Sequence, residues 1–231
     1  MNIEEFLFWE SSRRDAYFEL AECYKLPDNE LTLRINKLEQ VFQPLGSDAL
    51  YQIIVQCAAN LEQLDVQTLK VDFSQLFIGP YNLLAPPYGS VYLEGKRKIM
   101  GDSTMDILRR YTEVGLTTSE NFIDIPDHIR AELEFMHFLI FKEIEATRKE
   151  DVNDFTNFLN NQQSFLEQHL CAWISDFADK VANNAQTSFY QNLARATEAF
   201  VKNDYLMVSS ILCSWQSNVG NPVELTSLQT E

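Results

Sequence analysis

The chain has 231 residues, of which 45% are hydrophobic, so it is long enough for one domain with a full core and too apolar for a disordered chain. Its 18 basic and 34 acidic residues give a formal charge of −16. This charge argues against nucleic acid and anionic membrane surfaces, which are bound through Lys and Arg, and it favours basic partners.

The N-terminal stretch MNIEEFLFWESSRRDAYF has no basic region before an apolar run, so we expect no secretory signal. No apolar stretch is long enough for a membrane span, and we expect no membrane insertion. Four widely spaced cysteines form no CxxC pair. We interpret them as reduced, mostly buried thiols of a cytoplasmic protein, with a disulfide as the less favoured alternative: Cys23, Cys57, Cys171 and Cys213.

Glycine and proline are scarce, at seven each, which favours helices over a turn-rich β fold. Apolar side chains at helical spacing predict a first helix over residues 3–25. A second helix is expected from Asp28 to Pro44, and a third begins after the cap residue Ser47. The fourth is expected over residues 65–77.

Further helices are predicted in the second half of the chain. A short helix capped by Asp102 or Ser103 is expected to run through Tyr111. The others are a long helix over residues 124–149 with Pro126 in its first turn, one or two helices over 152–182, and two over 187–212.

We therefore predict an all-α fold, a single-domain bundle of about ten helices with one long irregular loop at 78–101. The single domain spans residues 1–231. Its predicted parts are N-terminal helices over 1–77, the loop, C-terminal helices over 102–215 and a polar tail over 216–231.

The loop segment LFIGPYNLLAPPYGSVYLEG, residues 76–95, is long and apolar for a connector. One interpretation is that its apolar side chains cover a gap between helices. The other is a binding function, because a long irregular stretch in a compact domain is uncommon unless it is functional. Tyr88 and Tyr92, four residues apart, can present aromatic faces to an apolar helix while their hydroxyls meet water or backbone.

Other motifs have simpler interpretations. Arg13-Arg14 is expected to lie on a solvated helix face rather than to form an export motif. His137 and His169 are expected to be packed or hydrogen-bonded structural groups, and the basic run GKRK at 95–98 a solvated turn. The sequence has no metal, phosphate-loop or nucleophile motif, so we expect no cofactor, no metal and no catalytic residue.

Asp127-His128 opens the long predicted helix. A structural interpretation is favoured: Asp127 would interact with the helix dipole and His128 would pair with Glu132, four residues on. In the alternative, the two side chains project into a groove and recognise a cationic or hydrogen-bonding ligand.

The run LFIGPYNLLAPPYGSVYLEGKRKIMGDSTMDILRRY resembles the signature stretch of the TorD/DmsD/NarJ family, and most closely its DmsD branch, in LF-x-GPY, APP, GSV and GDST. PDHIRAELEFM is similar to the family's Asp-His segment, and FLEQHLCAWISDFADKV to its HL-x-x-W helix. The resemblance covers about residues 70–200. It implies an all-helical cytoplasmic chaperone for the maturation of molybdenum-cofactor oxidoreductases, and not an enzyme.

The resemblance implies two partners: the twin-arginine leader peptide and the apo-form of a catalytic subunit of dimethyl-sulfoxide-reductase type. The chaperone would hold the precursor until cofactor insertion and export, with the export machinery as a further contact. The leader-binding positions carried over from the family are Phe73, Leu76, Phe77, Pro86, Pro87, Tyr88, Ser90, Tyr92, Asp127 and His128. The DmsD branch usually has tryptophan where this chain has Phe73, Tyr88 and Tyr92.

Two alternatives remain at this point. One is a NarJ-like assembly factor for a non-exported reductase, and the less favoured one is an all-α enzyme that uses Asp127 and His128 as an acid-base pair. The sequence does not identify the client, and it leaves open a monomer, a domain-swapped dimer and guanine-nucleotide binding.

Overall fold

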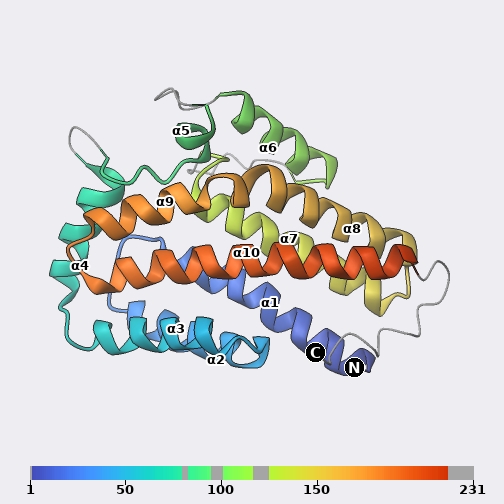
Figure 1. Cartoon of the computed structure of the whole chain (residues 1–231), viewed down its shortest axis with the longest axis horizontal. Helices are drawn as coiled ribbons and strands as arrows, with labels where there is room; N and C mark the ends of the chain where they lie inside the picture. Colours follow the sequence, from blue (N-terminus) through green and yellow to red (C-terminus); the bar gives the residue numbers. More distant parts are fainter. Residues whose placement is uncertain (1, 80–82, 95–100, 117–124, 218–231) are drawn as a thin grey trace.

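The computed structural model describes residues 2–79, 83–94, 101–116 and 125–217, and these form ten α-helices and no strand (Figure 1). The predicted all-α fold is confirmed. The helices are α1 Ile3–Cys23, α2 Leu31–Phe42, α3 Asp48–Leu61, α4 Val66–Phe73, α5 Gly89–Leu93, α6 Asp102–Glu113, α7 Ile129–Arg148, α8 Val152–Phe165, α9 Cys171–Asn184 and α10 Ser188–Ser217.

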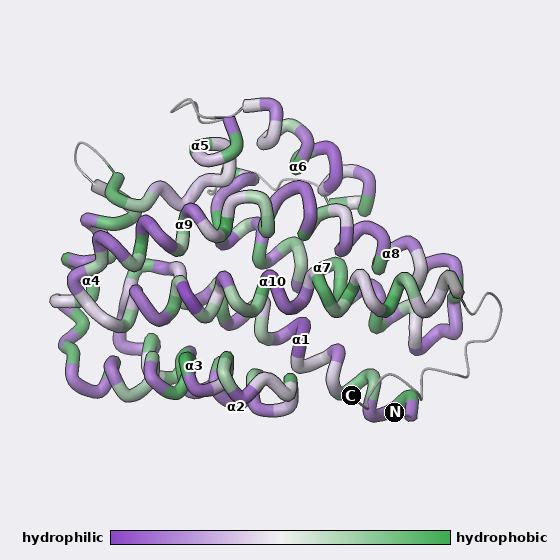
Figure 2. Tube along the Cα trace, in the orientation of Figure 1, coloured by the Kyte–Doolittle hydropathy of each residue, from purple (hydrophilic) through white to green (hydrophobic). Residues whose placement is uncertain are grey.

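The helices pack as a bundle around α1, α7 and α10. α1 lies along α7 and is flanked by α2, whereas α10 packs against α9 and α3, and α8 packs against both α7 and α10. α5 packs against α6 and α9, and Figure 1 places α5 and α6 at the edge of the bundle opposite α2 and α3. Polar and apolar residues are interspersed along each helix in Figure 2, as expected for amphipathic helices that bury one face.

Two helices continue into a wider, π-helical turn. Ser74–Ile78 follows α4, and Leu166–Leu170 joins α8 to α9. Such turns are often found at functional sites. The first one ends at Gly79, which has a φ of 53° and donates its N–H to the Ser74 carbonyl, and glycine adopts this left-handed region at little cost.

The predicted irregular loop contains a helical turn, α5, so the prediction of irregular structure throughout 78–101 is wrong. The reason is a cap from a distant segment. Asp127 accepts the Gly89 N–H with its carbonyl oxygen at 2.8 Å and the Ser90 N–H with its carboxylate at 2.9 Å. These are two of the N–H groups that a helix start leaves without an intrahelical partner.

Two predicted helix starts also differ from the structure. α6 begins after Gly101, and Ser103 donates both its N–H and its hydroxyl to the Glu94 carboxylate, at 2.9 and 2.7 Å, so Ser103 connects α6 to α5 instead of capping α6. α7 begins at Ile129, so Pro126 precedes the helix. His128 caps α7, because its Nδ1 accepts the Arg130 N–H at 3.1 Å.

The two helices predicted over 187–212 form one helix of 30 residues, α10. Asn203-Asp204 does not interrupt it. The Asp204 carboxylate points into the core, where it accepts hydrogen bonds from Tyr17 at 2.6 Å and from Arg13 at 3.1 Å. Because these partners are side chains, the carboxylate does not compete for the backbone N–H groups of the helix.

Arg13 is buried, with 1% of its surface exposed, so the prediction of a solvated Arg13-Arg14 face is wrong for this residue. Its guanidinium contacts side chains from three other helices as well as its own: Glu10 at 2.7 Å, Asp204 at 3.1 Å, Glu143 at 3.0 Å and Gln162 at 2.7 Å. We call these five residues the Arg13 cluster. Arg13 is buried because α1 is packed against other helices on several sides.

Cys23, Cys57 and Cys171 are free thiols. Cys23 and Cys57 are buried, whereas Cys171 is half-buried and Cys213 is exposed. No helix in the described ranges has the length and apolar character needed to cross a bilayer. The polar tail lies almost wholly outside the described residues, which end at 217.

Candidate functional site

The loop and the start of α7 lie side by side. The Ile129 N–H donates to the Pro87 carbonyl at 2.8 Å, and Tyr88 forms an antiparallel bridge with His128. Together with the Asp127 cap of α5, these bonds join two segments that are almost forty residues apart in the chain. The structure therefore brings together Pro87, Tyr88, Ser90 and the Asp-His pair.

Aromatic rings line the outer side of this junction. The Tyr88 ring meets the His128 ring edge to face, with centroids 5.2 Å apart, and both residues are partly exposed. The Tyr92 ring is stacked on Trp173 at 5.4 Å, and its hydroxyl donates to the Pro86 carbonyl at 2.8 Å. The Lys180 ammonium lies over the Tyr92 ring, 4.6 Å from its centre.

Asp127 is fully buried. One carboxylate oxygen holds the Ser90 N–H, and the other has no hydrogen-bond partner within the described part of the chain. In this arrangement the carboxylate fixes α5 and does not face solvent. Its role is thus structural. Asp127 caps α5, whereas we expected from the sequence that it would interact with the dipole of α7.

Glu132 and Trp173 complete the inner side of the junction. Glu132 is fully buried and accepts the Trp173 indole N–H at 3.1 Å, which replaces the predicted pair with His128. Burial raises the pKa of Glu132 well above its usual value. A Cβ on Gly89 would lie 3.0 Å from both the Glu132 oxygen and the indole nitrogen, so only glycine fits without a shift.

Phe73, Leu76 and Phe77 lie beneath this surface and are at most 7% exposed. Phe77 contacts the rings of Phe73 at 5.0 Å and of Tyr190 at 5.9 Å, which makes it part of the aromatic core. The Leu76 carbonyl accepts the Ala85 N–H at 3.0 Å and so links this turn to the loop. The three side chains support the site from inside and are not at its surface.

Two exposed apolar residues next to these positions were not singled out from the sequence. Ile78 is 56% exposed and Leu84 is 41% exposed. Both occur among the aliphatic side chains of the loop segment, but periodicity does not tell which side chains of an irregular segment point outward. The basic run at 95–98 lies outside the described residues.

The other two histidines have the structural roles that were predicted. His169 is 3% exposed and its Nε2 lies 2.9 Å from Asp106 Oδ2, and His137 Nδ1 lies 3.1 Å from the Arg14 carbonyl. No cluster of side chains suited to a metal ion occurs in the ranges that the structure covers.

The described part of the chain is thus an all-helical bundle in which the loop is joined to the Asp127-His128 start of α7. A family model described as nitrate reductase delta subunit matches residues 36–179, more than half of the chain. The chain thus belongs to the TorD/DmsD/NarJ family of redox enzyme maturation chaperones.

Curated relatives agree with this assignment. The chain is 27% identical to the chaperone protein TorD of Vibrio parahaemolyticus over 158 residues, 68% of this chain and 69% of the relative. It is also 27% identical to the Tat proofreading chaperone DmsD of Salmonella paratyphi A over 185 residues, 80% and 76% of the two chains. Since both branches match equally well, assignment to the DmsD branch stays a prediction.

A solved structure supports the fold. A candidate redox enzyme maturation protein from Archaeoglobus fulgidus matches with a TM-score of 0.50 at 22% identity, over 84% of this chain and 93% of the other. The curated relatives are chaperones and not enzymes, which confirms the prediction that this chain is not an enzyme.

Proposed function

We propose that the protein is a cytoplasmic chaperone that binds the twin-arginine leader of a molybdopterin oxidoreductase precursor and holds the precursor until cofactor insertion and export. The observation that carries this proposal is the junction of the loop with the start of α7, made by the Ile129–Pro87 and Asp127–Ser90 hydrogen bonds. This junction places partly exposed aromatic rings on a surface that the loop and the start of α7 hold together.

The apolar middle of a leader would pack on this surface. Tyr88, Tyr92 and Pro86 are partly exposed, and Ile78 and Leu84 extend the apolar area. Burial of the apolar side chains of an amphipathic segment against a hydrophobic surface of the partner is a common mode of peptide recognition. Phe73, Leu76 and Phe77 would contribute by fixing the shape of the surface, since they are already buried.

The leader arginines need an exposed carboxylate, because guanidinium pairs best with carboxylates in a bidentate geometry. Asp127 is buried, and we assign this role first to Asp176 of α9, which is exposed. Burial, and after it the charge of Asp176, raises the pKa of the Tyr92 hydroxyl, which places this carboxylate near the Tyr92 ring. The net charge of −16 would speed the encounter with a basic leader.

Co-expression tests this function. A tagged copy of the chain is expressed with a precursor of dimethyl-sulfoxide-reductase type, either complete or without its leader. We expect co-purification of the complete precursor and strongly reduced recovery of the leaderless one. Equal recovery of both would mean that the chain recognises only the enzyme body, and recovery of neither would exclude this class of client.

A NarJ-like role for a non-exported reductase is the second candidate, favoured by the description of the matching family model. The two candidate functions differ in whether the arginine pair of the leader is recognised. A leader in which both arginines are replaced by lysine should bind less well if the chain recognises export leaders, and equally well if it recognises an N-terminal segment without this motif.

A further inference from the structure

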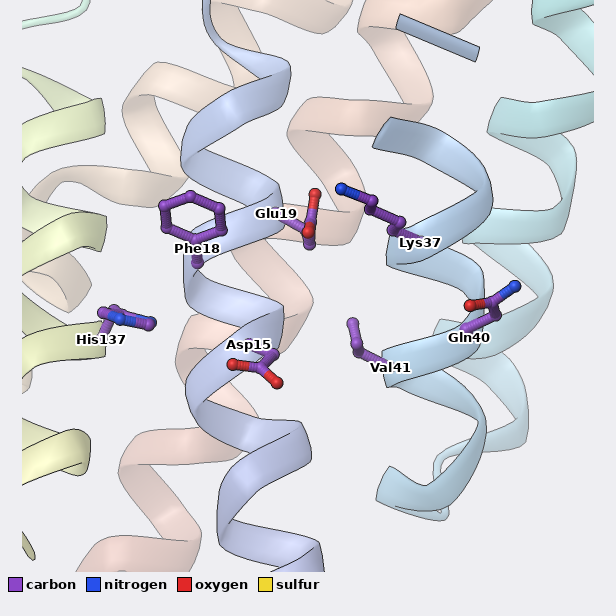
Figure 3. Close-up of a pocket in the computed structure, with 7 residues that line it drawn as sticks. All are labelled: Asp15, Phe18, Glu19, Lys37, Gln40, Val41 and His137. Atoms are coloured by element: carbon purple, nitrogen blue, oxygen red, sulfur yellow. The ribbon is translucent and has the colours of Figure 1, made fainter. Parts of the chain in front are cut away.

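A concave surface lies between α1, α2 and α7, away from the loop (Figure 3). It is a hollow of about 440 Å³, within the range of sites that hold small ligands or single side chains. Seven residues line it: Asp15, Phe18, Glu19, Lys37, Gln40, Val41 and His137.

Glu19 is the residue that points to a ligand. It is only 8% exposed, yet among the described residues it has no hydrogen-bond or ion-pair partner. Burial raises the pKa of its carboxyl group. A side chain this little exposed leaves its carboxylate with few waters, so a cation or donor that enters the hollow would find an unpaired acceptor.

The surrounding charges leave this carboxylate available. Lys37 faces Glu19 across the hollow in Figure 3, and its charge lowers the Glu19 pKa without an ion pair at contact distance. Asp15, one turn earlier on α1, already pairs with Arg14 at 2.7 Å. Burial lowers the pKa of His137, so the imidazole is neutral at pH 7 and does not repel a cation.

An aromatic ring stands beside the carboxylate. Phe18 is 40% exposed and its ring centre lies 5.4 Å from that of His137. A guanidinium is planar, weakly hydrated and able to stack on an aromatic face while its N–H groups reach a carboxylate. Val41 and the Gln40 amide supply an apolar contact for an alkyl stem and a further polar group.

We propose that this hollow is a binding site for an arginine side chain of a partner protein, with Glu19 as the carboxylate that receives the guanidinium and Phe18 as the ring on which it stacks. The site is on a different side of the bundle from α5, and the proposal does not depend on leader binding. Charge complementarity selects this occupant, because Glu19 is the one acidic group of the hollow without a partner in the described part of the chain.

The three histidines of the chain make the test simple, because only His137 lines the hollow. The complete protein is titrated with N-acetyl-arginine methylamide while the imidazole signals are followed by NMR. The neutral isostere N-acetyl-citrulline methylamide is the matched probe. We expect a saturable shift of His137, with a dissociation constant on the order of 1 mM, while His128 and His169 stay unchanged.

Substitutions in the hollow test the role of each side chain in arginine binding. Glu19→Gln should weaken arginine binding about tenfold, and Lys37→Gln should strengthen it severalfold by removing the competing cation. Glu62→Gln, an exposed change of the same charge outside the hollow, should have no effect. The proposal is overturned if citrulline shifts His137 as strongly as arginine, if His137 does not shift, or if Glu19→Gln binds like the unchanged protein.

Discussion

Replacement of Arg13 by methionine is a direct test of the Arg13 cluster. Methionine keeps most of the length of the side chain and removes its charge. The buried carboxyl groups of Glu10, Glu143 and Asp204 then lose the guanidinium that donates hydrogen bonds to them, at 2.7, 3.0 and 3.1 Å. Breaking a buried pair in this way costs about 3–5 kcal/mol, because the buried carboxylates that stay ionised are left without compensation.

Urea unfolding measures this loss. With a slope of about 3 kcal/mol per molar urea, the midpoint should fall by roughly 1–1.7 M. Arg14→Met is the matched control, since Arg14 is the neighbouring residue and forms a partly exposed pair with Asp15. The control should lose less than about 1 kcal/mol. Equal losses for the two variants would refute the reasoning.

A compensating variant separates charge from packing. If the cost comes from unpaired carboxylates, adding Glu143→Gln and Asp204→Asn to Arg13→Met should recover part of the lost free energy of unfolding, because neutral amides need no counter-charge. No recovery would mean that the loss is due to packing around the side chain.

Two further predictions concern the buried carboxyls. Burial raises the pKa of Glu10 to about 8. Between about pH 4.5 and 8, the folded state therefore keeps a proton that the unfolded state has released. The free energy of unfolding should fall as the pH rises through this range. Glu10→Gln should match the unchanged protein at pH 5 and exceed it at pH 8.5 in urea titrations; a constant difference would contradict this. Gly89→Ala should lower the free energy of unfolding by about 1–3 kcal/mol, because the new Cβ would crowd Glu132 and the Trp173 indole. The same crowding should change the fluorescence of Trp173. An unchanged emission spectrum would show that α5 shifts freely.

The helices were largely predictable from the sequence because local signals determine them. Pro44 and Ser47 mark the end of α2 and the start of α3, and the predicted helix over 65–77 corresponds to α4 and its π-helical turn. α10 was predicted as two helices. The contacts that hold Asp204 inside the core come from Arg13 and Tyr17, which are almost two hundred residues away along the chain.

The candidate site was predictable as a set of segments, but not in the exposure of its residues. Motif resemblance identified the loop and the Asp-His pair, which do meet. It did not show that Asp127 caps α5, that Phe77 belongs to the core, or that Glu132 pairs with Trp173. These facts depend on which helices pack together, and a single sequence has no local signal for long-range packing.

The most direct test of the proposed function is calorimetric titration with a synthetic twin-arginine leader of dimethyl-sulfoxide-reductase type. We predict a dissociation constant on the order of micromolar, and binding at least about tenfold weaker for the lysine-lysine leader and for Tyr88→Ala. Phe8→Ala, which removes a ring that is 65% exposed on α1, should bind the leader normally. Absence of binding to any such leader, or equal losses in Tyr88→Ala and Phe8→Ala, would contradict a leader site at the junction of the loop and α7.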